Sequence, residues 1–291
     1  MFEARYSEYL SKFNTYAEKF LNGIQTKPPV LGESIKYSFL NGGKRIRPVL
    51  ALATAEVLSL DEEKILPFAL ALEMIHTYSL IHDDLPAMDN DDFRRGQPSN
   101  HKAFGEGNAI LAGDALLNTA YSICFTECGK GEEQICAANI LCECAGINGM
   151  IAGQSADLAF EKQENLPTER DLFYVYERKT GKLLTSAVTM PSVLARNKYY
   201  FELEKFGLSL GMLFQITDDI LDEVGEFEKL GKSIGKDKKE NKLTSVKLYG
   251  IGGAKVHADM YAQDCYAILD ALDGDTSFLR DLVSYVRERE K

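Results

Sequence analysis

The chain has 291 residues, of which 45% are hydrophobic, and 33 basic against 44 acidic residues give a formal net charge of −11. This is the composition of a globular protein with enough apolar material for a sizeable core. The acidic excess argues against a nucleic-acid surface, which needs a basic field, and against an anionic membrane surface. No apolar run approaches the roughly 20 residues of a membrane span, and residues 1–20 lack a signal-type apolar segment. We therefore expect a cytoplasmic protein with no membrane span and no nucleic-acid partner.

Helical periodicity runs along nearly the whole chain, and strand signals are almost absent. Residues 61–81 begin with an acidic turn and continue as an apolar stretch that is typical of a buried helix. No internal repeat, low-complexity tract or linker marks a domain boundary, so we expect an all-α protein with a single domain over residues 1–291. The expected helices span residues 48–60, 61–81, 104–128, 131–157, 168–190, 198–223, 254–271 and 276–289.

The first chemical motif, HDDLPAMDNDDFRRG, occupies residues 82–96 and follows the apolar helix, which Pro86 must disturb or end. Its clustered carboxylates repel one another unless a divalent cation or the Arg pair at its end neutralises them, and carboxylates suit a hard ion such as Mg²⁺. A calcium-binding EF-hand loop starting at Asp89 is ruled out, because its Gly and Glu positions hold Arg94 and Asn100. A solvated acidic turn remains an alternative for this motif taken alone.

The second motif is FQITDDILD, residues 214–222. Asp218 and Asp222 are four residues apart and Gln215 is three before Asp218, so the three side chains share one helix face. Like charges at this spacing destabilise an isolated helix, and a bound cation would remove that conflict. Two acidic motifs that each close an apolar helix indicate a metal site more strongly than a lone surface pair does.

Basic residues that can recognise an oxyanion accompany the acidic motifs. The segment GGKRIRP, residues 42–48, places three cations within four positions, among them Lys44 and Arg47. His76 lies seven residues before Asp83, on the same face of the expected helix, although a buried core histidine is the alternative. Further candidates are Arg94, Arg95, Lys179, Lys182, Lys232, Lys236 and Lys242.

With these motifs in this order, the chain resembles the trans-isoprenyl diphosphate synthase family, and within it the bacterial farnesyl diphosphate synthase group. The segments that carry the resemblance are GGKRIRP, MIHTYSLIHDDLPAMDNDDFRRG, NHKAFGEGNAILAGDALL, ERKTGKLL, FQITDDILD and GKSIGKD. The resemblance implies a helical bundle of the isoprenoid synthase type around a deep central cavity, usually in a homodimer. It also implies two substrates, isopentenyl diphosphate and an allylic diphosphate, and three Mg²⁺ ions per site.

The resemblance also implies roles for individual residues. The metal ligands are Asp83 and Asp89, with Asp84 in support, and Asp218, with Asp222 and Asp219 nearby. Isopentenyl diphosphate is expected on Lys44, Arg47, His76 and Arg95, and the allylic diphosphate on Arg94, Lys179 and Lys232. Thr180 and Gln215 are expected beside the developing allylic cation. The residues expected to carry catalysis are Asp83, Asp84, Asp89, Arg94, Lys179 and Asp218.

The implied reaction is ionisation of the allylic diphosphate, attack by the double bond of isopentenyl diphosphate, and loss of a proton. Cations stabilise the leaving diphosphate, and apolar helices keep water from the carbocation. In the family, the residues four and five before the first Asp form the floor of the elongation cavity, and here these are Ser79 and Tyr78. An aromatic side chain about 7.5 Å along the helix from Asp83 favours farnesyl (C15) over geranylgeranyl (C20) product.

Two other functions are possible for a chain with Asp-rich motifs, one catalytic and one not. A terpene cyclase ionises the same kind of substrate but has no use for a second diphosphate pocket, which Lys44, Arg47, His76 and Arg95 would form. A non-catalytic subunit of a prenyl synthase generally loses one Asp motif, whereas this chain keeps both. The sequence therefore favours an autonomous prenyltransferase.

Overall fold

The computed structural model describes residues 2–161, 168–224 and 244–289. Within these ranges the chain is helical apart from one two-stranded antiparallel hairpin, in which Phe93 pairs with Pro98 and Arg94 with Gln97. The all-α prediction is therefore confirmed. The elements are α1 (Phe2–Asn22), α2 (Val30–Leu40), α3 (Ile46–Val57), α4 (Glu62–Asp83), β1 (Phe93–Arg94), β2 (Gln97–Pro98), α5 (Asn100–Phe104), α6 (Glu106–Cys128), α7 (Glu132–Ala145), α8 (Met150–Glu161), α9 (Glu169–Val175), the π-helix η1 (Tyr176–Gly181), α10 (Lys182–Leu194), α11 (Tyr200–Val224), α14 (Ser245–Asp270) and α15 (Ser277–Glu288).

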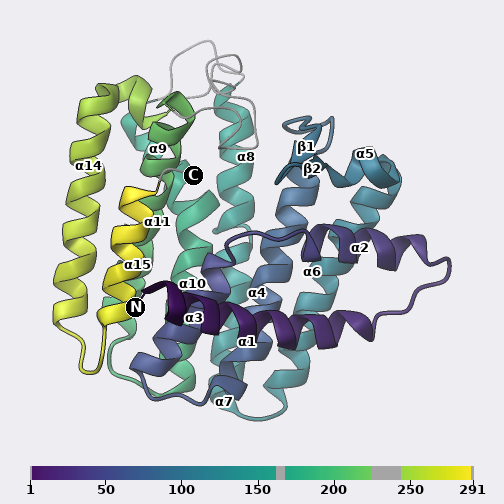
Figure 1. Cartoon of the computed structure of the whole chain (residues 1–291), viewed down its shortest axis with the longest axis horizontal. Coiled ribbons are helices and arrows are strands. Elements are labelled where there is room, and N and C mark those ends of the chain that lie inside the picture. Colours follow the sequence, from purple (N-terminus) through teal and green to yellow (C-terminus); the bar gives the residue numbers. More distant parts are fainter. Residues whose placement is uncertain (1, 162–167, 225–243, 290–291) are drawn as a thin grey trace.

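The long helices stand side by side, and α1 and α2 cross in front of them (Figure 1). Helix α4 packs on α6 and α3, α10 packs on α7 and α11, and α11 packs on α14. One continuous cluster of buried side chains runs through these contacts, with Phe68, Leu72 and Ile75 of α4 and Phe206 and Leu213 of α11 fully buried. The bundle is thus held together by apolar burial between helices that are far apart in the sequence.

The expected helix boundaries hold best for the apolar helices. Residues 131–157, expected as one helix, form α7 and α8 instead, with a turn that contains Gly149. A Cβ at Gly149 would lie 2.0 Å from the carbonyl oxygen of Cys144, so the close approach of this turn requires glycine. Helices α1 and α2 were missed, although Tyr9, Phe13, Ala17 and Leu21 place a buried residue on every fourth position of α1.

The expectation that no segment is long and apolar enough to cross a membrane is wrong by length and composition. Three segments meet those two criteria: Glu62–Asp83, Glu106–Cys128 and Glu132–Glu161. The sequence criterion failed because it required an uninterrupted apolar run, and these helices carry a few scattered charges. In Glu62–Asp83, 78% of the apolar window is buried inside the protein, against 33% and 28% in the other two.

Two helices place the Asp motifs at the same end of the bundle. Helix α4 starts at an N-cap, where the Asp61 side chain accepts a hydrogen bond from the Glu63 amide, and it ends at Asp83, as expected from Pro86. Helix α11 can approach η1 closely, because a Cβ at Gly211 would lie 2.5 Å from the Cα of Gly181. The C-terminal end of α4, followed by the hairpin, and the C-terminal end of α11 both lie at the upper end of the bundle in Figure 1.

Candidate active site

The two adjacent carboxylates of the first motif have different environments. Asp84 is buried, and it accepts hydrogen bonds from the Arg94 Nε at 2.9 and 3.3 Å, while Arg94 also reaches Asp91 at 3.2 Å. Burial raises the pKa of Asp84 to about 6, against the opposing effect of the Arg94 guanidinium. Asp84 therefore anchors Arg94, and with it the hairpin, to the end of α4.

Asp83 faces a second set of partners on η1 and α8. The Gln154 amide donates to Asp83 Oδ1, and Lys179 Nζ lies 3.9 Å from Asp83 Oδ2 and 2.7 Å from Asp157 Oδ2. Helix α8 approaches η1 closely because Gly153 has no side chain, and a Cβ there would lie 2.2 Å from the Lys179 amide nitrogen. Lys179 is thus held between two carboxylates on a π-helical turn, a geometry that is frequent at functional sites.

The loop after α4 folds back on the helix end. The Asp89 amide donates to the carbonyl of Asp83 at 2.9 Å, which brings the two expected metal ligands next to each other. Neighbouring carboxylates at one helix end repel each other, and a bound divalent cation would relieve this repulsion.

The two adjacent carboxylates of the second motif also differ in burial and in partners. Asp219 is buried, and its Oδ2 accepts hydrogen bonds from the Tyr176 hydroxyl, from the Ser245 amide at 2.7 Å and from the Ser245 hydroxyl at 2.8 Å. Asp218 is more exposed, with 38% of its side chain accessible, and its Oδ1 accepts a hydrogen bond from Arg289 at 3.0 Å. Asp219 therefore ties α11 to η1 and α14, whereas Asp218 faces outward.

Gln215 connects the two acidic motifs. Thr180 Oγ1 donates to Gln215 Oε1 at 2.8 Å, and Thr180 directly follows Lys179, which contacts Asp83. Of the remaining predicted residues, Asp222 is buried one turn after Asp218 on α11. The hydrogen bond between Thr180 and Gln215 thus connects η1, which carries Lys179, to the second motif on α11, and the expected place of these two residues beside the developing cation stays a prediction.

The basic residues form a cluster beside the first motif. Burial lowers the pKa of Arg47 to about 10, and Glu73 opposes this shift. Burial, followed by Arg47 and Arg95, holds the pKa of His76 well below its usual range. Arg95 donates to the carbonyl of Gly42 at 2.6 Å, which brings the hairpin to the GGKRIRP segment. Three of the four residues expected to bind isopentenyl diphosphate are therefore close enough to influence each other's charge: Arg47, His76 and Arg95.

Lys44 takes a position between this cluster and the second motif. Its pKa is lowered by burial and by Arg289, and raised by Asp218. The neighbouring Arg45 points elsewhere, into a buried ion pair with Glu73 at 2.9 Å. The other expected cations of this region, Lys232, Lys236 and Lys242, lie outside the described residues.

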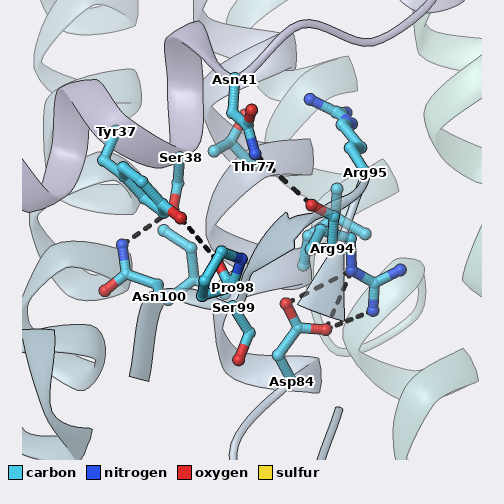
Figure 2. A pocket seen from close by; sticks show the side chains of 12 residues that line it. Tyr37, Ser38, Asn41, Thr77, Asp84, Arg94, Arg95, Pro98, Ser99 and Asn100 are labelled. Atoms are coloured by element: carbon cyan, nitrogen blue, oxygen red, sulfur yellow. Dashed lines mark hydrogen bonds and ion pairs between the residues drawn. The ribbon is translucent and has the colours of Figure 1, made fainter. Parts of the chain in front are cut away.

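A small pocket lies behind the Asp84–Arg94 pair (Figure 2). Its volume is about 20 Å³, enough for roughly one water molecule and too small for a substrate. Figure 2 shows the hydrogen bonds that hold its walls: Asn41 donates to the carbonyl of Arg94 at 3.4 Å, and Tyr37 to that of Pro98 at 2.8 Å. The side chains around the pocket therefore hold the hairpin that carries Arg94 and Arg95 in place.

The two residues expected to set chain length differ in burial. Tyr78 is 6% exposed, burial raises the pKa of its hydroxyl to about 12, and its ring meets His82 edge-on at 5.7 Å. Ser79 is half-buried, and its hydroxyl donates to the carbonyl of His76 at 2.8 Å. Tyr78 is thus a packed wall residue of α4, while Ser79 turns toward its own helix backbone.

Three residues at the site were missed in the sequence. Gln154 and Asp157 lie three apart on one face of α8, and that spacing was a signal that could have identified them. Arg289 stands alone after the end of α15, and no local pattern marks it.

The donor chemistry of the site fits Mg²⁺. Within the described residues, no group of three or more His, Cys, Asp or Glu side chains could hold a metal ion by itself. Mg²⁺ does not require such a cage, because it binds through one or two carboxylates together with water and substrate phosphates. Asp83 and Asp89 on one side and Asp218 on the other supply such carboxylates, with cations nearby for a diphosphate.

Comparisons with known proteins agree with this geometry. Residues 28–271 match the family described as polyprenyl synthetase. The chain is 40% identical to a farnesyl diphosphate synthase of Micrococcus luteus over 280 residues, 96% of each chain, and 43% identical to that of Geobacillus stearothermophilus over 271 residues, 90% of each chain. A geranyltransferase structure from Helicobacter pylori, complexed with magnesium and isoprenyl diphosphate, has a TM-score of 0.83 at 31% identity and covers 97% of this chain and 96% of its own. The chain belongs to the polyprenyl synthetase family.

Proposed function

We propose that this chain is a farnesyl diphosphate synthase, a trans-prenyltransferase that condenses isopentenyl diphosphate with geranyl or dimethylallyl diphosphate. Family membership and bacterial relatives named farnesyl diphosphate synthase at about 40% identity support the activity. The observation that carries the C15 product is the buried ring of Tyr78, on the same helix as Asp83 and five residues before it. A growing chain that follows α4 from its diphosphate end meets this ring after about 7.5 Å.

The allylic diphosphate is assigned to the end of the bundle where Asp83 and Asp218 lie. Asp83, Asp89 and Asp218 would hold Mg²⁺ there, proposed as three ions per site, and the bound metal would supply positive charge to the leaving diphosphate. Lys179, fixed between Asp83 and Asp157, and Arg94, fixed by Asp84, supply protein cations there. Because both cations are held in place before the substrate arrives, they need no rearrangement at the moment of ionisation.

Isopentenyl diphosphate is assigned to the cluster of Arg47, His76 and Arg95, with Lys44 at its edge. A neutral His76 can donate one hydrogen bond to a phosphate oxygen, while the two arginines supply the charge. The Thr180 hydroxyl and the Gln215 amide oxygen present dipoles to the allylic cation between the two diphosphates. The double bond of isopentenyl diphosphate attacks this cation, and the proton that is then lost goes to the departed diphosphate.

A C20 product is the second candidate. A chloroplastic geranylgeranyl pyrophosphate synthase 7 of Arabidopsis thaliana is 38% identical over 98% of this chain and 84% of its own. We favour C15 because a large ring at position 78 shortens the available wall of α4.

Product analysis tests the proposal. The purified chain is incubated with Mg²⁺, labelled isopentenyl diphosphate and geranyl diphosphate, and the dephosphorylated products are separated by length. We expect a dominant C15 alcohol from the wild type and none from Asp83→Asn. Asp92→Asn is the control in the same loop and should keep the C15 product, because Asp92 is exposed and pairs with Lys102 at 2.8 Å. A dominant C20 alcohol would keep the reaction and reject the Tyr78 floor, whereas no elongation with geranyl or dimethylallyl diphosphate would reject the reaction.

A homodimer is part of the proposal. Ile110, Leu111 and Phe125 of α6 are 45%, 55% and 77% exposed, and their spacing of 14 or 15 residues is close to four helical turns, so they share one face. Ile147, in the turn between α7 and α8, is 85% exposed, and Ile151 of α8 is 43% exposed. Exposed apolar side chains of this size support contact with a second copy. Light scattering during gel filtration should give twice the 32.4 kDa of one chain, and a single-chain mass would reject the dimer.

A cytoplasmic location is also proposed. All six cysteines are free thiols, and two of them, Cys136 and Cys142, are exposed, which suits a reducing compartment. Cell fractionation with an antibody against the chain tests this location.

A further inference from the structure

The feature with an unexplained role is Arg289, which follows the last helix. Its side chain is only 4% exposed although it lies next to the end of the chain. Its Nη2 donates to Asp218 Oδ1 at 3.0 Å and to the carbonyl oxygen of Phe214 at 2.7 Å. A buried guanidinium therefore contacts the exposed carboxylate of the second Asp motif.

Two contacts hold Arg289 on α11 without help from Asp218. One is the hydrogen bond to the Phe214 carbonyl, and the other is the Phe214 ring, whose centroid lies 3.9 Å from the guanidinium carbon. Stacking of a guanidinium on an aromatic ring is a favourable cation–π arrangement. The arginine is thus fixed to the same helix as Asp218, one turn before it, and does not depend on the ion pair for its position.

A fixed cation at this place has an electrostatic consequence. Arg289, which lies 3.0 Å from Asp218 Oδ1, repels any dication that approaches the same carboxylate. Lys44 adds to this repulsion, because both Arg289 and Asp218 are near enough to influence its charge. A diphosphate carries negative charge into the site and offsets both cations.

We propose that Arg289 is a positioning residue that orients the Asp218 carboxylate and weakens metal binding there until a diphosphate arrives. This inference rests on the proposed role of Asp218 as a metal ligand. Metal loading of the second motif then depends on the diphosphate, and by linkage the diphosphate binds more tightly once metal is present. The device keeps the second motif from holding metal before there is a substrate to ionise.

Metal binding to the whole chain tests the inference without relying on turnover. Mn²⁺ replaces Mg²⁺ as the probe, and its affinity is measured by equilibrium dialysis in the absence of any diphosphate. Arg289→Gln removes the charge and should tighten Mn²⁺ binding by about fivefold or more, the lower end of usual coupling between sites. Arg289→Met, a second neutral variant that can still cover the Phe214 ring, should behave alike, and Arg289→Lys should stay within about twofold of the wild type.

Inorganic pyrophosphate provides the second measurement. In the wild type it should raise the amount of Mn²⁺ bound per chain, and in Arg289→Gln this increase should shrink, because the metal already binds without it. Arg287→Gln is the matched control, since Arg287 lies two residues before Arg289 in the last turn of α15, is exposed, and pairs with Asp259 of α14 at 2.6 Å. This control should bind Mn²⁺ like the wild type.

Asp218→Asn separates the two ways in which the experiment can fail. If, in the presence of pyrophosphate, Asp218→Asn binds as much Mn²⁺ per chain as the wild type, the proposed metal site is wrong. If Asp218→Asn lowers this binding but neither neutral variant of Arg289 tightens Mn²⁺ binding in the absence of pyrophosphate, the inference about Arg289 alone is overturned. The inference is overturned as well if Arg289→Gln still tightens Mn²⁺ binding in a chain that also carries Asp218→Asn, because the effect then does not act through Asp218.

Discussion

The neutral state of His76 predicts how the stability of the protein depends on pH. His76 lies on α4 in a cluster of cations, and burial followed by Arg47 and Arg95 holds its pKa well below the usual 6.5. The unfolded chain, in contrast, binds a proton at His76 as the pH falls below about 6.5. In that range the unfolded state holds more protons than the folded state, so the free energy of unfolding decreases as the pH falls.

The expected loss follows from the unfolded state alone. At pH 5.5, one unit below the unfolded pKa, protonation stabilises the unfolded chain by about 1.4 kcal/mol, and at pH 7.5 by less than about 0.1 kcal/mol. His76→Gln removes the titrating group and keeps a neutral hydrogen-bonding side chain. The difference in unfolding free energy between wild type and His76→Gln should therefore change by about 1.3 kcal/mol between these two pH values.

Urea denaturation followed by far-UV circular dichroism measures this difference, at one protein concentration because association shifts the transition. Subtracting the two unfolding free energies at each pH cancels the contribution of every titrating group that both proteins share. One of these is His101, the pKa of which is also lowered by burial. If this difference stays constant from pH 7.5 to 5.5, His76 does not remain neutral in the folded protein and the reasoning is refuted. If the difference changes in the opposite direction, His76 is charged and stabilised in the folded protein.

Three further changes have defined outcomes. Glu73→Gln leaves Arg45 buried without its partner and should lower the free energy of unfolding by about 3–5 kcal/mol, measured in urea; a loss below about 1 kcal/mol would contradict this. Gly211→Ala places a Cβ 2.5 Å from the Cα of Gly181 and should cost about 1–3 kcal/mol, measured as a lower melting temperature, whereas an unchanged melting temperature would show that the helices can separate at no cost. Tyr78→Ala opens the wall of α4 and should shift the product from C15 to longer alcohols, and an unchanged product would place the floor elsewhere.

The sequence was most informative where function depends on neighbouring residues. Both Asp motifs, the GGKRIRP segment and the buried α4 were identified because their patterns are local, and the structure brings their residues to one end of the bundle. The roles assigned to these residues stay predictions, as do the single domain over residues 1–291 and the deep cavity. Family membership and the all-α fold are confirmed.

What the sequence did not predict depends on contacts between distant elements. Arg45 and Arg47 are two residues apart and chemically alike, yet one is used in a buried pair with Glu73 and the other belongs to the basic cluster beside His76. Arg289 reaches Asp218 across 71 positions of the chain. No local periodicity distinguishes such residues, because their roles are decided by which helices pack together.

The doubled aspartates illustrate what local geometry does decide. Consecutive residues of a helix point about 100° apart, so two adjacent carboxylates cannot both face one site. In each motif one of them is buried: Asp84 fixes Arg94 and the hairpin, and Asp219 fixes the start of α14 through Ser245. The other carboxylate, Asp83 or Asp218, has a cationic side chain as a partner. Burial of Asp84 is costly, as its pKa of about 6 indicates, and in return the cation that it holds is in place before any ligand binds. The second Asp of each pair is therefore best understood as a support that holds protein groups of the site in place.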